Sequence, residues 1–237
     1  AHLNDPSADV RLDAVELAGS LATTQTLVHL QRTAEMETDP IVRKVANNYV
    51  YLHTERSIET LPQRLSDPRG LISAAAYRQL FNLPAAEANP ICVKVLDANM
   101  GPDAIFHALI VLERKATPSE EPAIRSCLDR ALEKKDGGRV CNCMDALSRV
   151  ATPQDIELFR KLVDSELTWV PVSAIRALGV AKDKASVPRL IPFLENQQVR
   201  SAARAALESI SGKNFGYDSA KWREWYGQES GMTEDRP

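Results

Sequence analysis

The sequence predicts an all-α fold in which about seven pairs of helices stack in tandem. Alanine and leucine, both strong helix formers, dominate the chain, and aromatic residues make up only 5 % of it. A large β-sheet would contain more β-branched and aromatic residues. A turn followed by an apolar stripe also recurs at a spacing of about 30 residues, which lies in the range of solenoid repeats.

The first helix of each unit is predicted to begin at a turn. In the first unit, Asn4-Asp5-Pro6 supplies a polar cap and a proline near the first helical position. The apolar residues that follow recur at helical spacing and form one stripe. These residues are Val10, Ala14, Leu17, Ala18 and Leu21. Equivalent turns precede six further first helices, at Thr38, Ser66, Gly101, Gly137, Val170 and Asn196.

The second helix of each unit follows a short polar break and carries its own apolar stripe. The second-helix stripes cover residues 27–30, 58–65, 91–96, 124–132, 156–162 and 187–194. Pro192 lies late in the last of them and is expected to distort its final turn. A single helix pair cannot bury its apolar face alone, so neighbouring pairs are expected to share one continuous core.

The C-terminal segment differs in composition because it concentrates aromatic side chains. These are Phe215, Tyr217, Trp222 and Trp225. The last repeat of a solenoid has no following neighbour, so its apolar face needs a cover. We therefore expect a solenoid over residues 1–210, a capping segment over 211–228 and a disordered polar tail over 229–237.

Three segments carry a resemblance to a known repeat family. Asp5-Pro6 with Val10-Arg11, Asp39-Pro40 with Val42-Arg43, and residues 174–179 (Ala-Ile-Arg-Ala-Leu-Gly) resemble HEAT repeats. The match is to the short HEAT-like class of phycobilisome lyases and many bacterial proteins. The resemblance implies a right-handed α–α superhelix of the armadillo-like kind. The resemblance predicts the fold but says little about the function, because solenoids carry many functions.

Charge and apolar content argue against several function classes. The net charge of −3 disfavours general nucleic-acid binding, which needs a basic field. No apolar run approaches the roughly 20 residues of a membrane span. No phosphate loop, nucleophile elbow or carboxylate pair suggests catalysis or a bound cofactor. The chain is therefore expected to be noncatalytic and without a cofactor. Free thiols favour a cytoplasmic location, and the sequence leaves the oligomeric state open.

Histidines and cysteines give no metal-binding pattern. None of the four histidines belongs to a His-Glu pair of the kind that HEAT-repeat deoxyhypusine hydroxylases use to hold iron. The side chains of Cys141 and Cys143 point about 200° apart on a helix, so their two sulfur atoms cannot coordinate one metal ion together. We interpret the cysteines as small buried residues, and Cys127 is expected to approach Cys143 across adjacent helices.

The recurring arginines of the first helices are expected to form a ladder that pairs with nearby acids such as Asp5, Asp9, Asp39 or Glu166. Some members could instead receive an acidic partner. The ladder positions are Arg11, Arg43, Arg139, Arg176 and Arg200.

The preferred function is that of a scaffold or adaptor that binds an acidic protein or peptide segment on a concave face lined by second helices. Trp169 at an inter-repeat turn either packs over the next turn or is exposed as a contact hot spot. Bilin-lyase activity and DNA binding of the HEAT-like glycosylase kind are the alternatives. The candidate partner-binding residues are Arg32, Arg64, Lys94, Arg125, Arg130, Arg160, Lys161, Arg189 and Trp169.

Overall fold

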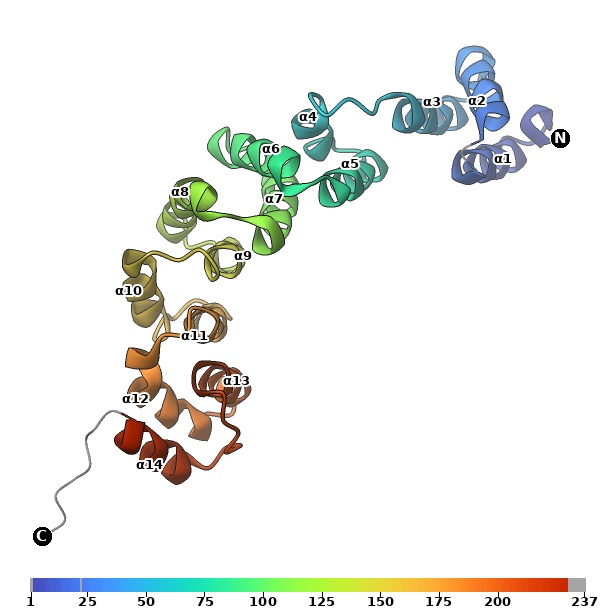
Figure 1. Cartoon of the computed structure of the whole chain (residues 1–237). Coiled ribbons are helices and arrows are strands. Elements are labelled where there is room, and N and C mark those ends of the chain that lie inside the picture. Colours follow the sequence, from blue (N-terminus) through green and yellow to red (C-terminus); the bar gives the residue numbers. More distant parts are fainter. Residues whose placement is uncertain (1, 22, 230–237) are drawn as a thin grey trace, which may run out of the picture. The chain divides into compact units, whose positions relative to one another are not determined.

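The computed structural model describes residues 2–21 and 23–229, and every regular element within these ranges is an α-helix or a short 3-10 helix (Figure 1). The all-α prediction is confirmed for these residues. Contacts between residues gather in two compact units, Ala1–Leu83 and Pro84–Pro237, and each unit is described here by itself.

Unit 1 contains five α-helices and one 3-10 helix among its described residues. They are η1 (His2–Asn4), α1 (Ala8–Leu21), α2 (Thr24–Met36), α3 (Pro40–Thr54), α4 (Leu61–Leu65) and α5 (Gly70–Asn82). Helices α1, α2 and α3 pack on one another, and α4 packs on α5. The second helix expected over residues 58–65 is only one and a half turns long, because Ile58 lies outside it and is exposed.

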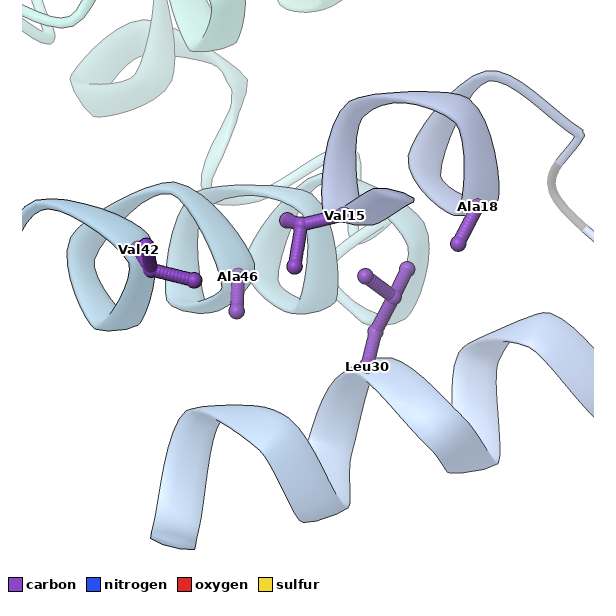
Figure 2. Close-up of a cluster of buried hydrophobic side chains, with 5 residues drawn as sticks. All are labelled: Val15, Ala18, Leu30, Val42 and Ala46. Carbon is purple, nitrogen blue, oxygen red and sulfur yellow. The ribbon is translucent and has the colours of Figure 1, made fainter. Parts of the chain in front are cut away.

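The core of unit 1 lies between its first three helices (Figure 2). It contains Val15 and Ala18 from α1, Leu30 from α2, and Val42 and Ala46 from α3. These five side chains are almost entirely buried. The core therefore joins α1 and α3, the first helices of two successive repeats, through the second helix α2.

The expected apolar stripe of α1 is only half covered. Ala18 is buried, whereas Leu17 and Leu21 are 63 % and 58 % exposed. Val15, which lies outside the expected stripe, is fully buried against α3. The stripe prediction was wrong for Val10, Leu17 and Leu21 as core residues, because the neighbouring η1 and α2 leave an open hollow on that side of α1.

Unit 2 arranges its helices in two rows. Its elements are α6 (Ala85–Asp97), α7 (Pro102–Lys115), η2 (Pro118–Glu120), α8 (Glu121–Glu133), α9 (Gly137–Leu147), α10 (Pro153–Leu162), α11 (Val170–Val180), η3 (Lys184–Ser186), α12 (Val187–Leu190), η4 (Ile191–Glu195), α13 (Arg200–Ser211) and α14 (Ser219–Glu229). Helices α7, α9, α11 and α13 form the first-helix row, and each packs directly on the next. Helices α6, α8, α10 and α12 form the second-helix row.

The first-helix row lies on the inner side of the bend that unit 2 makes in Figure 1. Successive helices of this row are in close contact, whereas α8, α10 and α12 touch one another more loosely. Closer spacing on one side bends a stack of helix pairs toward that side. The expectation that second helices line the inner face was therefore wrong for unit 2.

Small residues set the close spacing of the first-helix row. A Cβ atom added to Gly179 of α11 would lie 2.7 Å from the Cα of Ala206 in α13. The backbones of these two helices therefore touch at a point where no side chain fits. The same relation occurs in unit 1, where a Cβ on Gly19 would lie 2.3 Å from the ring of Tyr49.

Local sequence signals account for several helix boundaries. The Asp39 carboxylate accepts hydrogen bonds from the backbone N–H groups of Ile41 and Val42, with Pro40 as the first residue of α3. Pro192 ends the α-helical geometry of α12, and the chain continues as the 3-10 helix η4. The distortion expected at Pro192 is thus confirmed.

Aromatic side chains close the C-terminal end of unit 2. Trp222 of α14 is fully buried and donates from Nε1 to the carbonyl of Gly216 at 3.0 Å. Phe215 and Trp225 meet its ring edge-on, at centroid distances of 4.8 and 6.0 Å. Helix α14 packs on α12 and η4, the end of the second-helix row. Tyr217 is instead 47 % exposed, beneath the guanidinium groups of Arg200 and Arg204.

The boundaries expected for the C-terminal segments shift slightly. Helix α13 extends to Ser211 and α14 extends to Glu229, so the residue expected to begin the disordered tail is helical. The remainder of that predicted tail, residues 230–237, lies outside the described residues.

Adding one methyl group at the Gly179 contact tests the close spacing. Because the neighbour is backbone and cannot rotate away, we expect Gly179→Ala to lower the free energy of unfolding by about 1–3 kcal/mol. Urea denaturation followed by circular dichroism measures the change. Gly138→Ala in α9 is the matched control, since its Cβ would meet only a side-chain oxygen at 3.7 Å. Equal stability of the two variants would contradict the close contact.

Candidate partner-binding face

Trp169 is the most exposed of the large apolar side chains in the described chain, at 72 % of its surface. It is the N-cap residue of α11 and has a backbone φ of +67°, in the left-handed region. That conformation costs a residue with a bulky side chain roughly 1–2 kcal/mol. The N-cap residue of α7 also has a positive φ, of +44°, but there the residue is Gly101. The packing interpretation of Trp169 was therefore wrong. Its exposure is confirmed, and its role as a contact hot spot stays a prediction.

A hollow of about 490 Å³ lies beside Trp169. It is formed by the loop that precedes α11, the first turn of α11 and the turn that precedes α13. Pro171, Val172 and the Trp169 ring supply apolar lining, and Glu166 and Gln198 supply polar groups. A concave apolar surface with a few polar groups is the usual form of a site that receives an anchoring side chain.

A second hollow lies between α7 and α9 in the same row. It has a volume of about 260 Å³, and its lining includes Phe106, which is 47 % exposed. Asp103, Arg139 and Asn142 provide its polar lining. The first-helix row of unit 2 therefore presents two exposed aromatic rings, Phe106 and Trp169. Each ring lies beside a hollow near the N-terminal ends of the first helices. We call this surface the aromatic face.

The cations predicted to bind a partner on the second helices are largely engaged within the fold. Arg125 of α8 donates to Asp155 of α10 at 2.5 Å, and Arg160 of α10 donates to Asp183 at 2.6 Å. One repeat earlier in the same unit, the side-chain amide of Asn89 in α6 donates a hydrogen bond to the Glu120 carboxylate at 2.9 Å. These three contacts link successive second helices and form a polar ladder on that row.

The acids of this ladder also cap helices. Asp155 and Glu120 accept backbone and hydroxyl hydrogen bonds from Thr152 and Thr117, respectively, in capping boxes. Burial disfavours the charged form of Asp155, but the bonds from Thr152 and Arg125 outweigh it and lower the pKa of this carboxyl. The repeated Thr-Pro-x-acid pattern was the sequence signal that could have located the ladder.

The other predicted binding cations divide into buried, bonded and exposed groups. Arg64 is only 2 % exposed and donates to the side-chain oxygen of Gln79 at 2.9 Å, so its assignment to a binding surface was wrong. Arg130 donates to the carbonyl of Leu96 at 2.8 Å, and Arg189 pairs with Asp164. Arg32, Lys94 and Lys161 are exposed, and so is Arg189 despite its ion pair.

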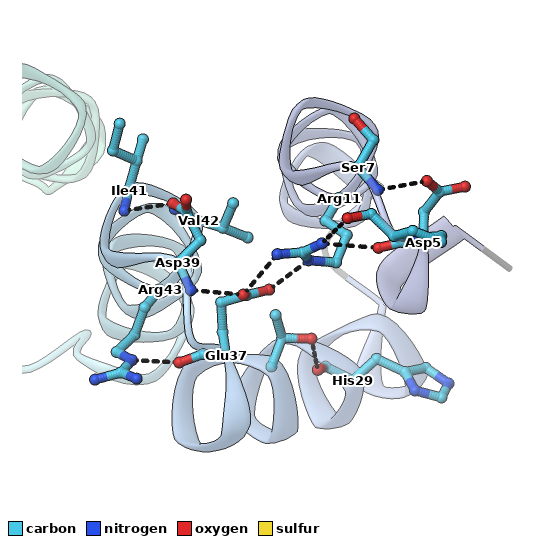
Figure 3. Close-up of polar contacts among 11 residues, drawn as sticks. Asp5, Ser7, Arg11, His29, Glu37, Asp39, Ile41, Val42 and Arg43 are labelled. Carbon is cyan, nitrogen blue, oxygen red and sulfur yellow. Dashed lines mark hydrogen bonds and ion pairs between the residues drawn. The ribbon is translucent and has the colours of Figure 1, made fainter.

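The first-helix arginines pair with acids only in part as expected: Arg139 lies beside an acid of its own turn, whereas Arg11 and Arg43 have partners other than those expected. Arg11 donates from Nε and Nη2 to the two carboxylate oxygens of Glu37, at 2.9 and 3.0 Å (Figure 3). It reaches Asp5 through the backbone carbonyl rather than the carboxylate. Arg43 donates to the carbonyl of Glu37 at 2.6 Å. Glu37, which sequence reasoning missed, is therefore the centre of this network.

The later ladder arginines each have a different contact. Arg139 lies 3.4 Å from the Asp136 carboxylate in its own turn. Arg176 lies 3.3 Å from Asp145 of α9, the preceding first helix. Arg200 lies over the ring of Tyr217. Equivalent sequence positions therefore do not form one uniform ladder.

The four cysteines are free thiols. The expected approach of Cys127 to Cys143 is confirmed, since these two buried thiols of the packed helices α8 and α9 influence each other's pKa. The neighbouring Cys143 thiol lowers the pKa of Cys127 to about 7, and Cys127 and burial raise the pKa of Cys143. Over residues 2–21 and 23–229, no three His, Cys, Asp or Glu side chains gather as a metal site requires. No helix in the same ranges combines the length and apolarity needed to cross a bilayer.

Removing the charge of Glu37 tests the network in Figure 3. The hydrogen bonds from Arg11 lower the pKa of Glu37 from 4.5 to about 2. A lowered pKa stabilises the fold above pH 4.5, and this contribution disappears as the pH falls toward 2. We expect Glu37→Gln to cost about 2 kcal/mol of unfolding free energy at neutral pH, with the difference from the natural chain vanishing at low pH.

Urea denaturation at several pH values measures this difference. Glu35→Gln on the exposed side of α2 is the control and should match the natural chain throughout. A Glu37→Gln penalty that persists unchanged down to the lowest pH would show that the carboxylate is not responsible.

No known family model matches the chain, and no curated protein is significantly similar to it. The HEAT-like resemblance therefore stays a prediction, as do the bilin-handling and DNA-binding alternatives.

Proposed function

We propose that this chain is a HEAT-like repeat protein that acts as a noncatalytic adaptor and binds an extended protein or peptide segment on the aromatic face. The observation that carries the proposal is Trp169, an exposed indole held in left-handed backbone beside a hollow of about 490 Å³. Strained, exposed aromatic residues persist where function offsets their cost.

Repetition of one helix contact supports the HEAT-like assignment. Val42 and Ala46 of α3 are buried, and so are Val170 and Ala174 of α11, at equivalent places in the repeat. Gly19 and Gly179 also occupy equivalent places, and each receives the following first helix. A unit that repeats both its sequence and its contact is the defining property of a solenoid, for which the family predicts a right-handed superhelix.

The partner is expected to present an apolar or aromatic side chain to the hollow beside Trp169. The lining there is mainly apolar, with Glu166 as its one charged group. The acidic partner expected from the second-helix arginines has less support, because Arg125 and Arg160 are already paired with carboxylates. Affinity would come from a few aromatic anchors rather than from total contact area.

Replacing Trp169 separates binding from folding. Asparagine adopts left-handed backbone more readily than tryptophan does, and little of the Trp169 surface is buried. We expect Trp169→Asn to leave the stability unchanged or to raise it by up to about 1 kcal/mol, and to weaken binding by roughly thirtyfold, the loss expected of a hot-spot residue.

The binding measurement uses peptides selected on the natural chain from a displayed random library. Their affinities for the natural chain, for Trp169→Asn and for the control Val180→Asn are then compared by calorimetry. Val180 is 46 % exposed at the opposite end of α11, so its replacement should leave affinity intact. Failure to enrich any peptide, or equal affinity for Trp169→Asn, would contradict the proposal.

A further inference from the structure

A hollow of about 300 Å³ in unit 1 is lined by three arginines and by no carboxylate. Its lining comes from the end of α3, the loop that follows it, α4 and α5. Arg56 and Arg78 are exposed, Arg64 is buried, and His53 and Gln79 complete the polar lining. The volume is at the small end of ligand-binding pockets, so it suits a small ligand or a single side chain. We call this hollow the arginine pocket.

Arg64 supplies a buried positive charge to the arginine pocket. At 2 % exposure it is too buried to belong to an open binding face, and no other described arginine or lysine is buried. Its Nη1 donates to a neutral acceptor, the side-chain oxygen of Gln79, at 2.9 Å. Its Nε is also buried and has no hydrogen-bond partner. A guanidinium removed from water in this way costs free energy unless a negative charge and acceptor atoms reach it.

Arginines of other second helices have the counter-charge that Arg64 lacks. Arg125 of α8 reaches the carboxylate of Asp155, and Arg160 of α10 reaches that of Asp183. Both arginines are less deeply buried than Arg64, so the need for a counter-charge is smaller there. The most buried arginine of the described chain is thus the one that ends on a neutral amide.

Glu55 interacts electrostatically with Arg64, but its carboxylate is held by other groups. Its Oε1 accepts hydrogen bonds from the backbone N–H of Ser57 and from the Thr60 hydroxyl, at 3.0 and 2.9 Å. These two bonds, followed by the attraction of Arg64, lower the pKa of Glu55. Within the described chain, none of the three pocket arginines forms a salt bridge. The pocket therefore combines three guanidinium groups with an unused buried donor.

We propose that the arginine pocket binds a phosphate group, supplied by free phosphate or by a phosphate monoester. Guanidinium groups present planar pairs of N–H donors that match the oxygens of phosphate. A phosphate group carries more charge and more acceptor oxygens than a carboxylate, so it matches three guanidinium groups better. The small volume and the net charge of −3 favour a single phosphate group over a nucleic-acid backbone.

This site is separate from the proposed adaptor function. The arginine pocket is built from unit 1 alone, whereas the aromatic face belongs to unit 2. Phosphate binding can therefore fail while peptide binding to the aromatic face succeeds, and the reverse.

Calorimetric titration of the full chain with inorganic phosphate and with O-phosphoserine tests the site. We expect the natural chain to bind at least one of them, and Arg64→Gln to weaken that binding by about tenfold or more, because a charge-assisted hydrogen bond is lost. Far-UV circular dichroism checks that this buried substitution folds. Arg78→Gln changes an exposed residue of the same pocket, so it should fold like the natural chain and weaken binding in the same direction.

The matched control is Arg32→Gln, which removes the same charge from an exposed arginine of unit 1 that does not line the pocket. It should bind like the natural chain. Tighter binding of O-phosphoserine would identify a phosphate monoester as the source, and tighter binding of inorganic phosphate would identify the free ion. The proposal is overturned if neither probe binds, if glutarate binds as tightly as they do, or if Arg64→Gln and Arg78→Gln both leave the affinity unchanged.

Discussion

Within each unit, the burial of one face of a first helix against the first helix before it is the constraint on which the rest of the structure depends. Valine, alanine and a third apolar residue form that face, as Val170, Ala174 and Ala177 do in α11. The opposite face must admit the next helix closely, which explains the glycine at 179. Large aromatic side chains have little room in such thin layers. Few of them lie inside the layers, where Phe159 is fully buried, and several gather at the C-terminal cap and on the aromatic face.

Close spacing of the first helices leaves the second helices further apart, and polar contacts connect them instead. Arginine and asparagine side chains are long enough to span this spacing, and they end on carboxylates that already cap the next helix. Asp155 and Glu120 therefore have two roles. Each caps the start of its own helical segment and also holds that segment to the preceding second helix. Arginines that are already paired with these carboxylates offer few hydrogen-bond donors to a partner. The candidate binding surface is therefore the aromatic face rather than the second-helix row.

Sequence reasoning succeeded where the physical cause is local. The Asp39-Pro40 start of α3 and the break at Pro192 depend on a few adjacent residues, and both lie where the sequence places them. It failed where the cause is a distant neighbour. The burial of Arg64 depends on α5, and the pairing of Arg125 spans 30 residues. For Trp169, the sequence located the turn, but only the coordinates give the backbone angle that makes its exposure informative.

The first helix α1 of unit 1 and the last first helix, α13 of unit 2, differ in the side chains that they expose. A terminal repeat is normally made polar on its open side, since an uncovered apolar face favours aggregation. The C-terminal end of unit 2 follows this rule, because Glu208 stands at the position that Gly179 has in α11, and α14 covers the adjoining row. Helix α1 keeps the apolar residues of an interior repeat at Val10 and Leu17. Helix α1 therefore shows how the same repeat residues project when no described first helix packs on them.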